Sequence, residues 1–412
     1  MIFAKIELMG KTLSKTIFST RLIVLLSLML GLVAIMVLLF LQSHQETLPA
    51  VQVDAGQTVE PKAPTEPTVA TSEVLTGLSH PWEIAFLPDK TMIFTERSGV
   101  LSTVKNGVKK QIATVPNVYK VNEAGLTGLA IDADFKSNRY IYTCFNAQTD
   151  SGLDVRLVRW KLGADLLSLS DRNDIVTNIP SNANGYHSGC RIKSAKDGTL
   201  WVGTGDAYRG GVAQSPTSLG GKILHVTRDG MPTGSNLPAP FDPRIFSYGH
   251  RNVQGIMLYE RPTANGVYGL SIEHGSDVDD EVNLIKKGNF GWAPTKTYVQ
   301  AGVPMTDLKK FPDALSAVWS SGGSTIAPSG GVILSGEKWG TYEGAVVMAV
   351  LKGKEVRVIK FKKDYTLDFQ KTVVSDVGRV RTAVQGPDGN LYISTDNGTN
   401  DKIIKLTPQL GK

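Results

Sequence analysis

Three polar residues in the middle of the chain have the types expected of an acid–base site. His187 lies in the segment 186–191, Asp206 ends the segment 202–206, and Arg251 lies in the segment 249–252. Histidine titrates near neutrality, so a histidine whose tautomer is fixed by a carboxylate can act as a general base. The same histidine, set among glycines, could instead be a turn or packing residue, and the trio alone leaves both interpretations open.

Three further cations occur near the C-terminus, at Lys352, Arg379 and Arg381. Residues two apart in a strand point to the same side, so the two arginines are expected to project together and could hold an anion. The alternative for an isolated Arg-x-Arg is a solvated basic edge of a sheet.

With these residues in place, the chain after residue 73 resembles the glucose/sorbosone dehydrogenase family, the soluble pyrroloquinoline quinone (PQQ) enzymes that include the aldose sugar dehydrogenases. Nine short motifs carry the resemblance, and it is their order along the chain that makes it specific. They lie at residues 80–83, 96–99, 123–130, 186–191, 219–224, 249–252, 279–283, 291–292 and 379–381.

The resemblance implies a role for each candidate residue in the oxidation of an aldose at its anomeric carbon to a lactone. His187 would take the hydroxyl proton while the quinone accepts hydride, Asp206 would orient His187, and Arg251 would face the reacting quinone oxygen. A fixed cation there stabilises the charge that develops in the transition state. Asn252 would contact the cofactor. Its three carboxylates would be bound by Lys352, Arg379 and Arg381, because guanidinium groups match carboxylates with paired hydrogen bonds.

Two further features follow from the resemblance. Glu123 falls where relatives place a glutamine or an acidic residue close to PQQ, although it could also cap the turn before Gly125. Calcium in this family bridges protein and PQQ as a Lewis acid. The matching carbonyls belong to Gly275 and Ser276, and relatives often have proline at the second position. The acidic run 279–281 lacks the spacing of an EF-hand loop and is expected to be structural.

The elements that would position these residues are short strands. A turn followed by a strand recurs at residues 87–95, 195–203 and 386–394, and Asp-Gly in two of these turns supplies the positive φ that a tight hairpin needs. Sustained helical periodicity is not found after residue 73, which argues against a doubly wound nucleotide-binding fold. The pattern predicts an all-β array, its length permits a propeller of six to eight blades, and the resemblance implies a six-bladed β-propeller.

The N-terminal part has a different composition. Residues 22–41 are twenty residues without a charge, preceded by basic residues, and such a stretch can cross the ~30 Å hydrocarbon layer. We expect a cytoplasmic segment at 1–21, an uncleaved transmembrane signal anchor at 22–41 rather than a cleaved signal peptide, and a disordered Pro/Thr-rich linker at 42–72. The propeller domain, 73–412, would then lie on the periplasmic or extracellular side of the cell membrane, where it could pass electrons to an external quinone or cytochrome.

Composition and cysteine content narrow the class further. The net charge is +6, and residues before 73 carry five basic and five acidic side chains, so the excess lies on the propeller. A long basic run with interleaved aromatics is missing, so nucleic acid is not an expected partner. Cys144 and Cys190 are the only cysteines; they could form one disulfide or remain buried thiols.

Two other classes remain open for a propeller of this kind. One is a calcium-dependent sugar lactonase, which would need acidic metal ligands in the central channel. The other is a non-catalytic propeller that binds glycan or protein. The three cations at Lys352, Arg379 and Arg381 argue against both. The histidines at 80, 225, 250 and 274 and the tryptophans at 82, 201 and 292 are expected to be structural.

Overall fold

The computed structural model describes residues 29–37, 39 and 64–411, and contact clustering separates residues 1–63 from residues 64–412. Residues 29–37 and 39 are helical. Among the described residues, no helix is long and apolar enough to cross a membrane. The predicted cytoplasmic segment 1–21 and half of the predicted anchor 22–41 lie outside the described residues.

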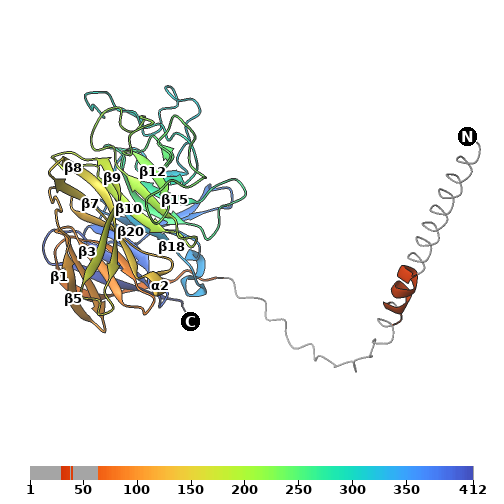
Figure 1. The fold of residues 1–412 in the computed structure, drawn as a ribbon. Coiled ribbons are helices and arrows are strands. Elements are labelled where there is room, and N and C mark those ends of the chain that lie inside the picture. The colour runs from red at the N-terminus through yellow and green to blue at the C-terminus, as the bar shows by residue number, and fades with distance from the viewer. Residues whose placement is uncertain (1–28, 38, 40–63, 412) are drawn as a thin grey trace, which may run out of the picture. The chain divides into compact units, whose positions relative to one another are not determined.

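Residues 64–411 form six antiparallel sheets of four strands each, the blades of a β-propeller (Figure 1). The predicted all-β, six-bladed propeller is confirmed. The first three blades contain β2 (Pro81–Phe86), β3 (Met92–Glu96), β4 (Val100–Lys105) and β5 (Val108–Thr114); β6 (Leu126–Ile131), β7 (Tyr140–Thr149), β8 (Gly152–Leu162) and β9 (Leu169–Pro180); and β10 (Gly189–Ser194), β11 (Leu200–Thr204), β12 (Lys222–Val226) and β13 (Ile245–Tyr248).

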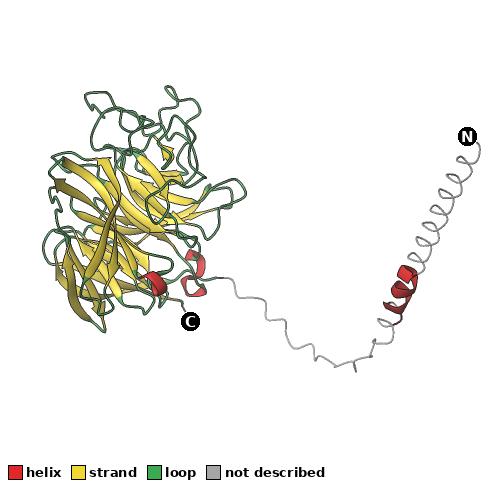
Figure 2. Cartoon of the chain, in the orientation of Figure 1, coloured by secondary structure: helices red, strands yellow, loops and turns green. Residues whose placement is uncertain are grey.

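The next two blades contain β14 (Val253–Leu258), β15 (Gly269–Glu273), β16 (Glu281–Leu284) and β17 (Trp319–Ser320), then β18 (Pro328–Ile333), β19 (Val346–Val350), β20 (Glu355–Phe361) and β21 (Leu367–Val374). The last blade combines both ends of the domain: β22 (Val380–Gln385), β23 (Leu391–Thr395) and β24 (Asp401–Gln409) pair with β1 (Thr68–Leu78). Besides these strands, residues 64–411 contain only the short helices α2 (Phe135–Asn138) and η1 (Glu337–Tyr342) (Figure 2).

The ring is closed by β1, and this changes one predicted boundary. Thr68 pairs with Gln409 and Ser72 with Lys405, so residues 68–72 belong to the last blade and not to the linker expected at 42–72. The Thr-rich composition of this segment suggested a disordered tether, but threonine and valine also suit a pleated strand once a partner strand is present.

The three turns predicted from their sequence join the first and second strands of their blades. In each, an aspartate Oδ1 accepts the backbone N–H two residues later, as in the 2.9 Å bond from Thr199 to Asp197. Gly198 and Gly389 have φ values of 82° and 73°, the left-handed conformation that glycine adopts without a Cβ clash.

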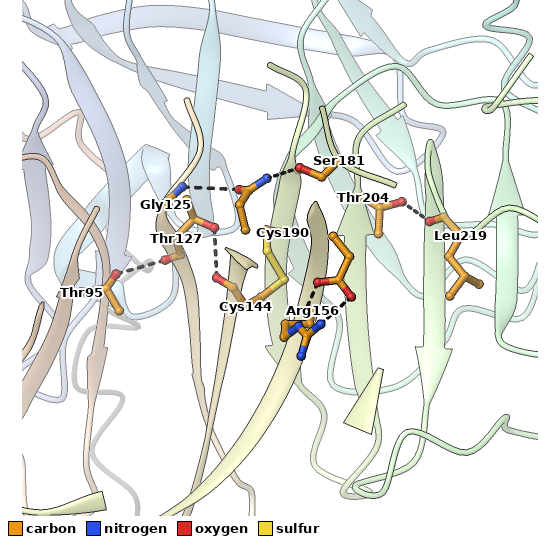
Figure 3. The surroundings of a disulfide bond; sticks show 12 residues. Thr95, Gly125, Thr127, Cys144, Arg156, Ser181, Cys190, Thr204 and Leu219 are labelled. Atoms are coloured by element: carbon orange, nitrogen blue, oxygen red, sulfur yellow. Dashed lines mark hydrogen bonds and ion pairs between the residues drawn. A yellow bond between two sulfur atoms is a disulfide. The ribbon is translucent and has the colours of Figure 1, made fainter. Parts of the chain in front are cut away.

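The core lies between neighbouring blades. One cluster, for example, joins Cys144 and Leu157 of the second blade to Ile192 and Leu224 of the third. The two cysteines form a disulfide across this interface, with a Cα–Cα distance of 5.5 Å (Figure 3). Cys190 therefore faces the blade interface.

Removal of the disulfide should destabilise the propeller. The bond joins residues 46 positions apart, and closing such a loop in the unfolded chain is worth about 2–4 kcal/mol. We expect Cys144→Ala/Cys190→Ala to lower the free energy of unfolding by this amount in denaturant titrations, with reduced wild-type protein as the matched control. An oxidised wild type no more stable than the double variant would contradict this.

Candidate active site

The predicted site residues converge on one end of the propeller, although they come from five blades. Each blade's first strand begins at this end and its second strand finishes there. Glu123, His187, Arg251 and Arg379 precede the first strands β6, β10, β14 and β22, whereas Asp206, Gly275 and Lys352 follow the second strands β11, β15 and β19. This shared topology explains how residues from 123 to 381 can form one site.

His187 and Asp206 form a buried pair. The Nδ1 atom of His187 lies 2.8 Å from Oδ1 of Asp206, and both side chains are almost fully enclosed. With the carboxylate on Nδ1, that nitrogen carries the proton and Nε2 is left as the basic atom. Nε2 forms no hydrogen bond with any residue in the described part of the chain.

Asp206 is itself held by donors on both oxygens. Oδ2 accepts hydrogen bonds from Trp292 Nε1 at 2.7 Å and from the Tyr298 hydroxyl at 2.6 Å, and Oδ1 also accepts the backbone N–H of Tyr208 at 2.9 Å. Burial, and then the charge of Asp206, raise the pKa of Tyr298, so its hydroxyl remains a donor. Trp292, which the sequence suggested was a packing residue, therefore contacts the site directly.

Trp292 and Tyr298 reach Asp206 because they belong to a long connection, residues 285–318, between β16 and β17. This segment runs beside the outer strand of the third blade, where Phe290 N–H bonds Tyr248 O at 2.8 Å and Trp292 N–H bonds Gly249 O at 2.9 Å. The length of this connection is the sequence feature that could have indicated a role at the site, because most loops between strands are short.

Arg251 supplies a cation beside this pair. Its guanidinium donates to Gln300 Oε1 at 2.9 Å and to the carbonyl of His274 at 3.1 Å, and it lies 5.7 Å from the Trp292 ring centre. It forms no ion pair with any carboxylate of the described chain. A backbone hydrogen bond also joins the third and fourth blades, because Asp206 N–H bonds Arg251 O at 2.9 Å.

Asn252 is buried next to Arg251 and has half of its hydrogen-bonding capacity unused. Its Oδ1 accepts from Gly189 N–H and Gln254 Nε2, both at 3.1 Å. Its Nδ2 is buried without a partner among the described residues. A buried unsatisfied donor costs stability, so such a group indicates a binding site for an acceptor.

Arg379 and Arg381 lie around one aspartate. Arg381 is only 6% exposed and pairs with Asp396, and Arg379 Nε donates to the Asp396 carbonyl at 3.0 Å. Although burial alone would raise the pKa of Asp396, Arg381 and His80 hold it well below its ordinary value. The solvated-edge interpretation is therefore wrong for Arg381, whereas Arg379 keeps a guanidinium without a carboxylate partner in the described chain.

A third arginine that sequence reasoning did not single out joins this group. Arg97 is half-buried at the end of β3, and the charges that act on it are those of Asp396, Arg381, Glu123 and Arg379. Its Nε is buried without a partner in the described residues. Arg97 lies within the 96–99 motif, so the sequence contained a feature that could have identified it as a site residue. Of Arg97, Arg379 and Arg381, Arg381 alone forms an ion pair with a carboxylate of the described chain, whereas Arg97 and Arg379 feel the charges of Asp396 and Glu123 without pairing with them.

Glu123 and Lys352 occupy different environments. A carboxylate oxygen of Glu123 accepts the backbone N–H of His187 at 3.1 Å, so Glu123 supports the histidine and does not cap its own turn. Lys352 is exposed in the turn between β19 and β20, with its backbone N–H bonded to Ile326 O at 3.0 Å.

The loop that contains Gly275 and Ser276 is fixed by Asp280. The Asp280 carboxylate accepts from Gly275 N–H at 2.9 Å and from Ile326 N–H at 2.6 Å, which ties the loop to the segment that supports Lys352. Burial raises the pKa of Asp280. The Gly275 and Ser276 carbonyls accept no hydrogen bond from the described residues. Asp280 is therefore structural, and the two carbonyls are available to a cation.

His225, His250 and His274 lie in different environments. His225 stacks on Trp201, burial lowers its pKa to about 4, and it is structural. His250 bonds Glu273 and is also structural. His274 is different: burial, then Arg251 and Arg381, lower its pKa well below the usual value, so it is a neutral neighbour of the site.

Among the described residues, one group of metal-ligating type is found at His80, Asp396 and Asp401. Its carboxylates are already engaged, since Asp396 pairs with Arg381 and Asp401 accepts the N–H groups of His80 and Asn397. This group therefore stabilises the last blade and lacks free ligand atoms for a metal.

Known proteins are similar to this chain over most of its length. The glucose/sorbosone dehydrogenase family model matches residues 78–405, and the chain belongs to that family. The aldose sugar dehydrogenase YliI of Escherichia coli is 28% identical, with 83% of this chain and 94% of that protein aligned.

Two solved structures have the same fold. The PQQ-bound aldose sugar dehydrogenase of Streptomyces coelicolor is 29% identical with a TM-score of 0.67, covering 84% of this chain and all of that chain. A putative oxidoreductase (glucose dehydrogenase) of Thermus thermophilus is 30% identical with a TM-score of 0.71, covering 82% of this chain and 99% of that chain.

Proposed function

We propose that this protein is a PQQ- and calcium-dependent aldose sugar dehydrogenase that oxidises the anomeric carbon of the sugar to a lactone. The observation that carries the proposal is the buried His187–Asp206 pair beside Arg251, which lacks a carboxylate partner in the described chain. Family membership and the PQQ-bound relative support it.

The residues present fit PQQ. Three hydrogen-bond donors have no carboxylate partner among the described residues: the guanidinium of Arg379, Nε of Arg97 and Nδ2 of Asn252. PQQ has three carboxylates and quinone oxygens that could accept from them. Arg381 would bind PQQ while also paired with Asp396, and exposed Lys352 would reach the carboxylate nearest solvent. Buried cations with too few counter-charges are stabilised by an acidic ligand.

In the proposed reaction, Nε2 of His187 accepts the proton of the anomeric hydroxyl. The imidazolium that forms is stabilised by Asp206, whose orientation Trp292 and Tyr298 fix. Arg251 supplies positive charge where negative charge develops. PQQ, when bound, would supply a quinone as the acceptor of hydride, so that the hydrogen on the anomeric carbon leaves together with two electrons. The carbonyls of Gly275 and Ser276 would hold calcium, a hard cation that prefers oxygen ligands.

The two other classes are less well supported. A lactonase would use acidic ligands to hold a catalytic metal, but the two carboxylates that bond His187 in the described chain, Asp206 and Glu123, are engaged by protein donors. A purely binding propeller would have no use for a histidine–aspartate pair with an unbonded Nε2.

We further propose that the catalytic domain works outside the cytoplasm, tethered to the cell membrane, and delivers electrons to a quinone or cytochrome. The Cys144–Cys190 disulfide supports an oxidising compartment. The apolar stretch at 22–41 and the basic residues before it are the basis for the anchor.

Reconstitution tests the function directly. Residues 64–412, purified without cofactor, should reduce a redox dye with aldoses only after both PQQ and calcium are added. The control is the same protein treated with a chelator and dialysed. Sugar oxidation that persists after both are removed would contradict the proposal.

His187→Ala should lower kcat by about 10²- to 10⁴-fold, the usual contribution of a positioned base. PQQ affinity, followed by absorbance titration, should change little, because His187 acts on the sugar. A variant with wild-type kcat would exclude His187 as the base, whereas loss of the folded state would mean that the residue is structural.

Arg379→Ala should weaken PQQ binding by about 2–5 kcal/mol, since a PQQ carboxylate would lose its charged partner in a partly desolvated site. Saturating PQQ should restore most of the rate. Arg172→Ala, on the outer strand of the second blade, is the matched control. Unchanged PQQ affinity with a collapsed rate at saturation would instead give Arg379 a part in the chemistry.

A further inference from the structure

Two tyrosines are exposed beside the buried base. Tyr186 and Tyr208 are 40% and 41% exposed, whereas the side chain of His187 is almost covered. The Tyr208 ring centre lies 5.1 Å from that of His187 in an edge-on arrangement, and 6.1 Å from that of Tyr186. On its inner side Tyr208 packs against Tyr298 at 4.1 Å. The two rings therefore form a continuous aromatic surface that begins at the base.

The backbone that carries this surface is in a disfavoured conformation. Ala207 and Tyr208 have φ values of 56° and 54°, which residues with a Cβ rarely adopt. The turn is held by the site itself, because Tyr208 N–H bonds Asp206 Oδ1 at 2.9 Å and Ala207 N–H bonds His187 O at 3.2 Å. The exposed position of Tyr208 is thus imposed by surrounding contacts.

A single amide fixes the two tyrosine segments to each other. Asn182 Nδ2 donates to Tyr186 O at 2.7 Å and to Ala207 O at 2.8 Å. Neither tyrosine hydroxyl bonds a residue of the described chain, in contrast to buried Tyr142 and Tyr298, which bond aspartates. A fixed, exposed aromatic pair with free hydroxyls next to a reactive group is expected to contact a ligand.

We propose that Tyr186 and Tyr208 bind the sugar unit next to the one that is oxidised, so that reducing-end oligosaccharides are the preferred substrates. This rests on the proposed function. The anomeric hydroxyl must reach Nε2 of His187, and the exposed rings of Tyr208 and Tyr186, which continue outward from His187, would then pack on the sugar unit linked to the reacting ring. The flat C–H face of a pyranose packs on aromatic rings, and its hydroxyls can bond the two free phenols.

Steady-state kinetics of the holoenzyme test the proposal with glucose, maltose and maltotriose. In the wild type, kcat/KM should be higher for the two oligosaccharides. Tyr186→Ala and Tyr208→Ala should lower the ratio of kcat/KM for maltose to that for glucose by about tenfold or more, mainly through KM. Tyr208→Phe, which keeps the ring, should retain most of the preference. Tyr365→Ala, in the turn between β20 and β21 at the opposite end of its blade, is the matched control.

Methyl maltoside gives a second readout that does not depend on turnover, because its anomeric hydroxyl is blocked. Saturation-transfer NMR with the holoenzyme should detect binding in the wild type and in Tyr208→Phe, and weaker binding in the two alanine variants. Equal losses of kcat/KM for glucose and maltose, or unchanged methyl maltoside binding, would overturn the proposal that Tyr186 and Tyr208 bind a second sugar unit. A change in the apparent KM for the electron acceptor alone would also overturn it. If no sugar is oxidised in the presence of PQQ and calcium, the proposed function fails, while the NMR result still decides whether the tyrosines bind a disaccharide.

Discussion

The carboxylate of Asp206 is the interaction on which the rest of the site depends. It accepts bonds from His187, Tyr208, Trp292 and Tyr298, and its own backbone N–H bonds Arg251 O. These partners come from two blades and from the long connection 285–318. A fully buried carboxylate tolerates removal from water only when its oxygens are satisfied, so the four donors and the aspartate require one another. The orientation of the base is therefore a result of how three segments pack.

A second constraint acts on the neighbouring arginines Arg97, Arg379 and Arg381. Asp396 accepts hydrogen bonds from Arg381, Arg379 and His80, whereas Arg97 forms no ion pair among the described residues, although the charges of Asp396 and Glu123 act on it. Holding several guanidinium groups in a partly buried space is unfavourable, and burial lowers the pKa of Arg97 and Arg379. An acidic ligand bound there would offset the repulsion between these guanidinium groups.

The parts of this architecture that depend on local chemistry could be predicted from the sequence. The Asp-x-x turns identify the hairpins because the aspartate bonds its own backbone, and the order of motifs brought His187, Asp206 and Arg251 together. Contacts between distant segments could not be predicted. Trp292 resembles any packing tryptophan until the path of its connection is known, and the pairing of Arg381 with Asp396 depends on the register of two strands.

Contact with a distant segment also explains why the propeller begins before the predicted boundary at residue 73. Thr68–Ser72 has the composition of a tether, and only the presence of β24 at the far end of the chain makes it a strand. Cys190 is a similar case, since its neighbours in the sequence do not reveal that Cys144 lies across the blade interface.

The pairing of β1 with β24 has a consequence for how the protein is made. Thr68 and Gln409 are separated by 341 positions, so the strand of the propeller synthesised first must wait for the strand synthesised last. Five blades can assemble from neighbouring hairpins as they emerge, but the sixth cannot be completed until β24 has been synthesised. Until then the edges of β1 and β23 that β24 covers are unpaired and open to association with other chains. The closing strand therefore also removes two exposed strand edges.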